Sequence, residues 1–378
     1  MIAVHAWNSL KNNEAAFEGA KPNGGKKAKN GPRKFGTVLT NANAGLGKGK
    51  GKKHSKPQKA AVAAVPIHTT AHSMVAPAPA VRPVSASAST KDISSRLSSL
   101  QLGSERPKDV DMADRSKPEC VTDYVVDIFK NFKKREINGC ASSNYMSGQK
   151  HITSKMRAIL IDWLVDVHLK FKLMPETLFL TVNMLDRFLQ AKVVDRNKLQ
   201  LVGVTCMLLA SKYEEIYFPE IRDFVYITNN AYNRRQILKM EEVVLNVLQF
   251  NLTVPTTNCF VKRFIKTANL DTCSKLKPMA SYLAERMLQE YDMLAFRPSV
   301  IAATAVSMSL SFLRQKPWHA TLTHYTGYNP SDLVKCKAKM TEILRTSQSH
   351  KAVAKKYSSS RYERVSVYVQ DRLKVESY

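Results

Sequence analysis

Hydrophobic positions from about residue 120 onward recur at helical spacing, with almost no strand-like alternation. Val121, Tyr124, Val125, Ile128 and Phe132 are three or four residues apart, which predicts an amphipathic helix that leads into the fold. Five further helices are expected before residue 252, and their starts carry capping signals. These starts are Thr153 or Ser154 (running to about Phe171), Pro175, about Asn197 (running to about Ile216), Pro219, and Asn233 (running to about Phe250).

The stretch from about Asn197 to Ile216 is apolar on nearly all sides, so we expect this helix at the centre of a bundle. A second round of helices begins near Pro255. Its expected members are residues 255–268, 274–291, 298–315, 319–326 and 330–347. The pattern therefore predicts an all-α protein made of two tandem five-helix bundles, over residues 116–252 and 253–378.

Residues 1–115 show no such periodicity. Gly-Lys alternations, an Ala-Pro-Val tract and a Ser-Ala run leave too few large apolar side chains to offset the entropy of the chain. This stretch holds 19 basic and 7 acidic residues, and therefore carries nearly half of the net charge of +27 in under a third of the length. We predict a disordered, basic regulatory tail.

The composition excludes or disfavours several classes of partner. The net charge of +27 invites a nucleic-acid partner, but no dense basic cluster occurs within the helical region, so nucleic acid is not the favoured partner. The six cysteines form no CxxC pair and no zinc-ligand spacing, so we expect no disulfide framework, metal or cofactor. No stretch reaches the ~18 apolar residues of a membrane span. A soluble protein of cytoplasm and nucleus is expected, without a membrane partner.

Three landmarks are charged or amphipathic segments set within apolar helices. They are MRAILIDWL (156–164), KYEE (212–215) and MEE (240–242). A folded monomer gains little from charges at such positions, so the landmarks predict that the chain docks onto another protein.

The residues around these landmarks resemble those of a known family. MRAILIDWLVDVHLKFKLMPETLFLTVNMLDRFL, KLQLVGVTCMLLASKYEEIYFPEIRDFVYIT and QILKMEEVVLNVLQFNL are similar to the first cyclin box of the mitotic cyclins, and EYDMLAFRPSVIAATAVSMSL to the second box of the B type. The resemblance covers about residues 120–360. It implies a regulatory subunit, not itself an enzyme, that binds and activates a cyclin-dependent protein kinase and controls the transition from G2 to mitosis.

The resemblance also implies which residues bind the kinase. Lys212 and Glu241 would anchor it by hydrogen bonds to its backbone, above an apolar floor. The floor residues are Leu209, Tyr213, Leu245, Phe250 and Leu252. Without the family resemblance, the more common interpretation is that a lysine and a glutamate on adjoining helices form an ion pair that only holds the two helices together. The surrounding KYEEIY and KMEEVVL sequences favour the kinase-binding interpretation.

A second implied site is a shallow groove that binds Arg-x-Leu motifs of substrates. Its expected members are Met156, Ile159, Leu160, Trp163, Asp166, Leu199 and Gln200, with Asp166 as the acidic neighbour of the motif's arginine. Spacings of three and four residues fit an ordinary core stripe equally well. Within the same helix, Arg157 and Asp162 are expected to form an internal ion pair that braces it.

A third implied site is a destruction signal in the tail. Residues 33–41 (RKFGTVLTN) match an R-x-x-L-x-x-apolar-x-N degron at Arg33, Leu39 and Asn41, with Gly36 in place of the usual leucine. The expected partner is a ubiquitin ligase of the anaphase-promoting type, with nearby lysines as ubiquitin acceptors or nuclear-import signals. The alternative from another class is a nucleic-acid-binding protein of cyclin fold resembling a transcription factor. Such proteins usually carry a zinc ribbon, and the absent CxxC pairs argue against it.

Overall fold

The computed structural model describes residues 106–268, 273–315, 318–346 and 351–375. Every regular element in these ranges is helical. The first bundle consists of α4 (Ser154–Phe171), α5 (Pro175–Ala191), α6 (Leu199–Glu214), α7 (Ile221–Ile227) and α8 (Arg234–Val247). Short 3-10 turns precede α4 and α6, at Tyr145–Gly148 (η3) and Arg196–Lys198 (η4). The five helices expected from the sequence are therefore confirmed.

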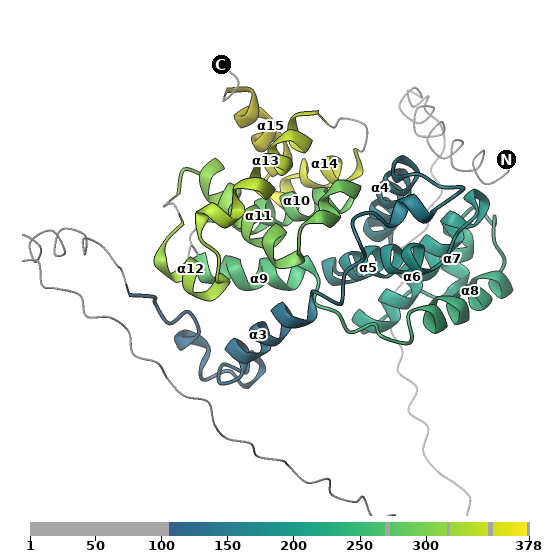
Figure 1. The fold of residues 1–378 in the computed structure, drawn as a ribbon, viewed down its shortest axis with the longest axis horizontal. Coiled ribbons are helices and arrows are strands. Elements are labelled where there is room, and N and C mark those ends of the chain that lie inside the picture. Colours follow the sequence, from purple (N-terminus) through teal and green to yellow (C-terminus); the bar gives the residue numbers. More distant parts are fainter. Residues whose placement is uncertain (1–105, 269–272, 316–317, 347–350, 376–378) are drawn as a thin grey trace, which may run out of the picture. The chain divides into compact units, whose positions relative to one another are not determined.

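Local sequence explains where these helices begin. The Thr153 hydroxyl accepts a hydrogen bond from the Met156 amide at the start of α4. Pro175 opens α5, and Asn233 forms a capping box with Gln236 at the start of α8. Every residue of α6 from Leu199 to Ser211 is buried, which places α6 at the centre of the bundle as its all-round apolar sequence predicts (Figure 1).

The second bundle repeats this plan with α9 (Thr257–Ala268), α10 (Leu276–Leu288), α11 (Pro298–Phe312), α12 (Ala320–Thr326) and α13 (Pro330–Thr346). A 3-10 turn, η5 (Tyr291–Ala295), lies between α10 and α11. Helix α11 is buried along most of its length and takes the central place here. Two further helices, α14 (Ala352–Tyr357) and α15 (Val365–Val375), follow with the turn η6 (Ser360–Tyr362) between them. The sequence pattern did not indicate these two helices.

The segment before the first bundle contains η1 (Met112–Asp114), η2 (Pro118–Cys120) and α3 (Val125–Arg135). Residues 106–115, expected at the end of the tail, are part of this described segment. Although α3 precedes the first bundle in sequence, its side chains contact the second. The rings of Phe129 and Phe132 lie edge-on to Phe260 of α9, with centroids 6.0 and 6.5 Å away. The Glu136 carboxylate accepts hydrogen bonds from the amide and hydroxyl of Ser299, at the start of α11.

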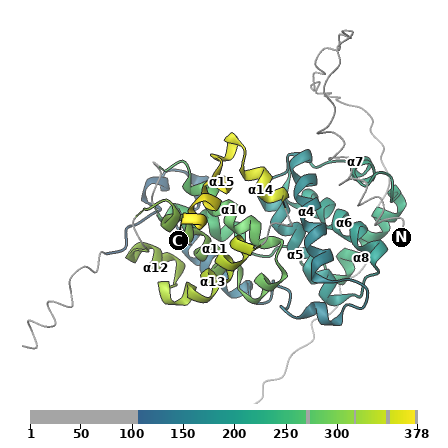
Figure 2. The ribbon, with the colours of Figure 1, turned by 90° about the horizontal axis from the view of Figure 1, so that it is seen from above.

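Helix α14 lies beside α4 (Figure 2), and polar contacts join α4 to this C-terminal part of the chain. Asp162 on α4 accepts a hydrogen bond from Gln289 Nε2 at 2.7 Å and from the Ala352 amide, at the start of α14, at 2.9 Å. Arg157 pairs instead with Asp186 of α5, with Nε to Oδ1 at 2.6 Å and Nη2 to Oδ2 at 2.7 Å. The expected Arg157–Asp162 pair is therefore wrong. Residues five apart project from different faces of a helix, whereas helical neighbours are three or four apart.

No helix in the described part of the chain combines the length and the apolar character needed to cross a bilayer.

Candidate functional site

The end of α6 and the middle of α8 meet at the surface of the first bundle. Lys212 Nζ donates a hydrogen bond to Glu241 Oε1 at 2.7 Å. The lysine side chain is 35% exposed and the glutamate side chain 13%. The structure thus brings the two expected anchors together in an ion pair that solvent reaches. Lys212 lies in the last turn of its helix, where a cation is favoured by the helix dipole.

Large apolar side chains lie exposed beside this pair. Phe250 is 66% exposed and Tyr213 is 46% exposed. Phe250 has a φ of +55°, a left-handed conformation that is costly for a bulky side chain. The Phe250 amide donates to the Leu245 carbonyl at 2.9 Å, which fixes the turn after α8. Leu245 and Leu252 are half-buried. Phe250 thus presents its ring to solvent from a left-handed backbone position.

Leu209 differs from the other floor residues because it is only 4% exposed. Its position one turn before Lys212 places it inside the first bundle. It therefore supports the surface from below and is not accessible to a partner.

The loop between α6 and α7 adds three residues that the sequence reasoning missed. Ile216 is 87% exposed, Tyr217 is 93% exposed and Phe218 is 48% exposed. They follow Lys212 by four to six residues, so they extend the same end of α6. Three consecutive large apolar residues between Glu214-Glu215 and Pro219 fit no helical stripe, and that mismatch was the available signal.

The expected substrate-groove residues divide between surface and interior. Met156, Ile159 and Trp163 of α4 are half-buried and Asp166 is exposed. Three others are buried, with exposed fractions of 2% to 7%: Leu160, Leu199 and Gln200. The surface part of the expected site is therefore a stripe along α4, which we call the α4 stripe (Met156, Ile159, Trp163, Asp166).

Close approach of α4 and α6 explains this division. A Cβ atom added to Gly203 would lie 2.9 Å from Leu160 Cδ1, so a larger residue at this position of α6 would require the Leu160 side chain to shift. Gln200 Oε1 is buried and has no hydrogen-bond partner among the described residues.

The described residues contain no group of three His, Cys, Asp or Glu side chains that would hold a metal ion. Burial raises the pKa of the Cys140 thiol to about 11 and that of Cys259 to about 12, so both thiols stay protonated at neutral pH. The degron residues Arg33, Leu39 and Asn41 lie outside the described residues.

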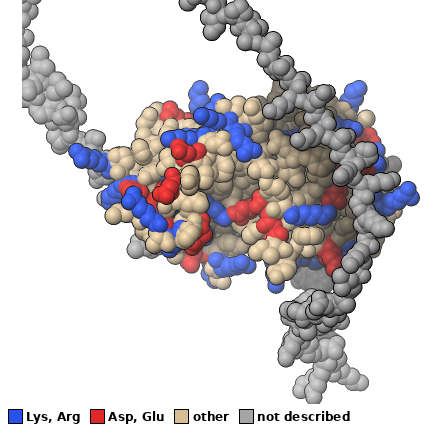
Figure 3. Space-filling view, turned by 90° about the horizontal axis from the view of Figure 1, so that it is seen from below, with Lys and Arg blue, Asp and Glu red and all other residues tan. Residues whose placement is uncertain are grey.

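Charges are mixed on one face of the described fold. On the face shown in Figure 3, Asp and Glu side chains lie among the Lys and Arg side chains. Nucleic-acid binding requires a continuous basic patch, and this face does not present one.

Comparisons with known proteins agree with the two-bundle division. Residues 127–253 match the family model described as "Cyclin, N-terminal domain", and residues 255–371 match "Cyclin, C-terminal domain". The break between them lies next to the boundary expected at residues 252 and 253.

Similar proteins include a Cyclin-B2-1 from Oryza sativa subsp. japonica, 44% identical over 261 residues, which are 68% of this chain and 62% of that protein. A G2/mitotic-specific cyclin-B from Patella vulgata is 44% identical and covers 68% of this chain and 63% of its own length. The G2/mitotic-specific cyclin cdc13 of Schizosaccharomyces pombe is 40% identical over 269 residues, 71% of this chain and 55% of its own. The matched region thus spans about three fifths of these relatives.

Among solved structures, a viral cyclin from herpesvirus saimiri superposes with a TM-score of 0.52 at 20% identity. The match covers 57% of this chain and 97% of the viral one, and it establishes similarity of fold.

Proposed function

We propose that this chain, which belongs to the cyclin family, is the regulatory subunit of a mitotic cyclin-dependent protein kinase, which it binds and activates. The observation that carries this proposal is the solvent-accessible Lys212–Glu241 pair beside the exposed ring of Phe250. Two of the named relatives are called G2/mitotic-specific cyclins, which supports the same phase of the cell cycle for this chain.

The first bundle suits this role because its docking surface rests on a buried helix. Lys212 and Tyr213 continue directly from the buried part of α6, and Glu241 is held by α8, which packs against α6. A surface that is rigid before binding loses little conformational entropy when a partner docks. The anchors also combine hydrogen-bonding groups with adjacent apolar area, the composition expected of a binding hot spot.

Activation then follows from selection of one kinase conformation. An active kinase needs its β3 lysine paired with the glutamate of its regulatory helix, and its activation loop in place. A partner that binds only the competent arrangement shifts a 1:99 population to 99:1 if its affinities for the two states differ by about 5.5 kcal/mol. The chain itself performs no chemistry in this scheme.

The test is the double variant Lys212→Ala with Glu241→Ala, assayed by kinase co-purification and histone phosphorylation. We expect binding and activation to be lost while the helical circular dichroism signal stays unchanged. The matched control is Lys198→Ala with Asp195→Ala, which removes an exposed ion pair of 3.2 Å at the opposite end of α6. Normal activation by the anchor variant would overturn the proposal.

We further propose that the α4 stripe recruits substrates that carry Arg-x-Leu motifs. Asp166 is exposed beside the half-buried Trp163, and the pair offers a carboxylate and an aromatic surface to an arginine and a leucine. Trp163→Ala should slow phosphorylation of an Arg-x-Leu substrate but not of the same substrate with both motif residues changed to alanine. Equal slowing of both substrates would show that Trp163 serves only the fold.

We also propose that Arg33, Leu39 and Asn41 form a degron read by a ubiquitin ligase of the anaphase-promoting type, and that the chain occupies both cytoplasm and nucleus. The sequence match and the lysines around it support this part. Arg33→Ala with Leu39→Ala should lengthen the half-life at mitotic exit in synchronised cells. An unchanged half-life would remove the degron, and fluorescence imaging of a tagged chain tests the localisation.

A further inference from the structure

We call residues 106–124 the N-terminal strap; residues 108–114 within it contact α9 and α12 of the second bundle. The Lys108 amide donates to the Thr321 hydroxyl at 3.2 Å, and the Val110 amide donates to the Tyr325 hydroxyl at 3.4 Å. Both acceptors are side chains of α12. The chain thus enters the described fold beside the second bundle and crosses from there to the first.

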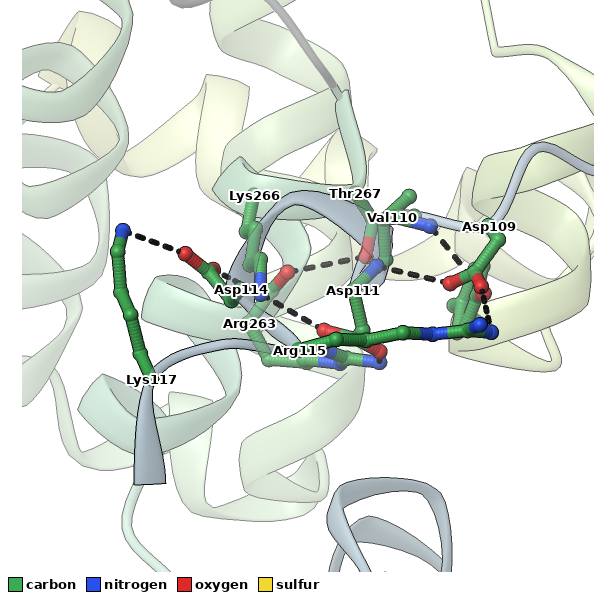
Figure 4. A network of polar contacts seen from close by, with 10 residues as sticks. Asp109, Val110, Asp111, Asp114, Arg115, Lys117, Arg263, Lys266 and Thr267 are labelled. Atoms are coloured by element: carbon green, nitrogen blue, oxygen red, sulfur yellow. Dashed lines mark hydrogen bonds and ion pairs between the residues drawn. The ribbon is translucent and has the colours of Figure 1, made fainter. Parts of the chain in front are cut away.

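A charged cluster holds the strap at Asp111 (Figure 4). Both Asp111 carboxylate oxygens accept hydrogen bonds from the two terminal nitrogens of Arg263, each at 2.6 Å. Lys266 Nζ lies 2.7 Å from Asp111 Oδ1 and 2.7 Å from Asp114 Oδ2. We call these four residues (Asp111, Asp114, Arg263, Lys266) the latch.

Two aromatic rings flank the arginine of the latch. Its guanidinium lies over the ring of Tyr325, 5.0 Å from the centroid, and over that of Phe129, 5.6 Å away. The Arg263 side chain is 5% exposed and the Asp111 side chain 8%. A bidentate, charge-assisted pair in such surroundings is strong and directional.

Apolar packing contributes little to the attachment of the strap. Among residues 106–124, Asp111 is the one buried side chain. The larger apolar side chains point into solvent, with exposed fractions of 69% for Met112, 47% for Val121 and 68% for Tyr124. A segment with few buried apolar contacts opens locally at low cost, so the latch decides whether this one stays attached.

The far end of α3 is attached differently. Glu136 is 1% exposed and holds Ser299 of α11, and Lys133 donates to the Thr326 carbonyl at the end of α12. The two ends of the segment therefore have separate polar attachments. The attachment at Glu136 does not depend on the attachment at Asp111.

We propose that the latch is a releasable intramolecular clasp. When it opens, the strap and the first turn of α3 detach as one local unit, while both bundles and the Glu136 attachment remain folded. Arg263 and Lys266 remain on α9, where they can form the ion pairs with Asp111 again. The proposal concerns the chain without its kinase, so it stands or falls separately from the proposed function.

The test is amide hydrogen exchange, read by mass spectrometry, on the full chain and on Asp111→Asn. We expect exchange in residues 106–128 to become about tenfold faster or more, since the variant loses its charge-assisted hydrogen bonds. Residues 133–139 and the two bundles should exchange as in the parent chain. The matched control is Asp127→Asn, which removes an exposed carboxylate in the first turn of α3 that pairs with Lys130, and it should accelerate exchange far less than Asp111→Asn.

A second variant keeps the test decisive if Asp111→Asn folds poorly. Lys266→Gln removes the more exposed cation of the latch and should give a smaller acceleration, confined to the same residues. Unchanged exchange at residues 106–128 in both variants would overturn the proposal. So would equal acceleration throughout α9, α10 and α11, because the latch would then stabilise the whole bundle and not the strap.

Discussion

Two ion pairs in the first bundle have nearly the same bond length and opposite surroundings. Arg157 Nε lies 2.6 Å from Asp186 Oδ1, with side chains 1% and 5% exposed. Lys212 Nζ lies 2.7 Å from Glu241 Oε1, with side chains 35% and 13% exposed. The distance alone does not distinguish a pair that holds the fold from a pair that a partner can use. The two kinds of pair differ in how deeply they are buried and in how many of their hydrogen-bonding groups remain without a partner.

Both side chains of the buried pair make further hydrogen bonds within the protein. Asp186 also accepts a hydrogen bond from the Tyr145 hydroxyl at 2.8 Å, and Arg157 Nη1 donates to the Leu288 carbonyl of the second bundle at 3.1 Å. Among the described residues, the Lys212 ammonium bonds only to Glu241, so two of its three donors remain for a partner. The first pair thus fixes the fold, and the second is accessible at its surface.

The largest effect that tests this difference is expected from Asp186→Ala. The variant leaves the Arg157 guanidinium buried without its carboxylate, which should lower the free energy of unfolding by about 3 to 5 kcal/mol. Urea denaturation followed by circular dichroism measures this. Asp186→Asn, which keeps the shape and part of the hydrogen bonding, is the matched control and should lose less. A loss below about 1 kcal/mol for Asp186→Ala would place the buried pair in the same class as an exposed one.

A second buried cluster, around His168 of α4, predicts a pH dependence. His168 is 3% exposed, and burial, with a smaller contribution from the Lys356 ammonium, lowers its pKa to about 3. Lys356 itself pairs with Glu285 at 2.8 Å, with both side chains almost fully buried. His168 Nε2 lies 3.1 Å from the Met174 carbonyl, where the neutral ring donates.

The direction of the pH dependence follows from the protonation state of His168 in the folded and in the unfolded chain. An unfolded histidine takes up a proton near pH 6.5, whereas His168 in the folded chain does not until about pH 3. The free energy of unfolding therefore falls as the pH drops below about 6.5, by about 1.4 kcal/mol per pH unit. Between about pH 6.5 and pH 5 the chain should lose about 2 kcal/mol, and His168→Gln should remove that slope. Parallel slopes for parent and variant would show that His168 titrates normally.

Much of the fold could be predicted because the residues that start a helix lie within a few positions of its first turn. Thr153 and Asn233 mark their helices through hydrogen bonds to residues three positions later, and Pro175 marks its helix through its fixed φ. The continuous apolar run of α6 requires burial on all sides, at the centre of the bundle. The partner of Arg157 could not be predicted, because Asp186 is 29 residues away and its approach depends on how α4 packs against α5.

The docking surface was predictable in part. The identities of Lys212 and Glu241 came with the family resemblance and not from spacing, since nothing local places residues 29 apart side by side. The exposed loop at Tyr217 and the attachment of the strap through Asp111 were missed for the same reason. Exposure and long-range salt bridges are properties of the packed chain, and a hydrophobic pattern does not encode them directly.

The smallest expected effect concerns the accessible pair itself. In a double-mutant cycle of Lys212→Ala and Glu241→Ala, the coupling free energy in the isolated chain should be about 1 kcal/mol or less, as for other solvent-reached pairs. High salt should reduce it further, because ions screen charges that water reaches. Urea denaturation of the parent, both single variants and the double variant gives the coupling. A coupling of about 3 kcal/mol would mean that the pair braces α6 against α8 as Arg157 and Asp186 brace α4 against α5, and the surface would lose its two anchors for a kinase.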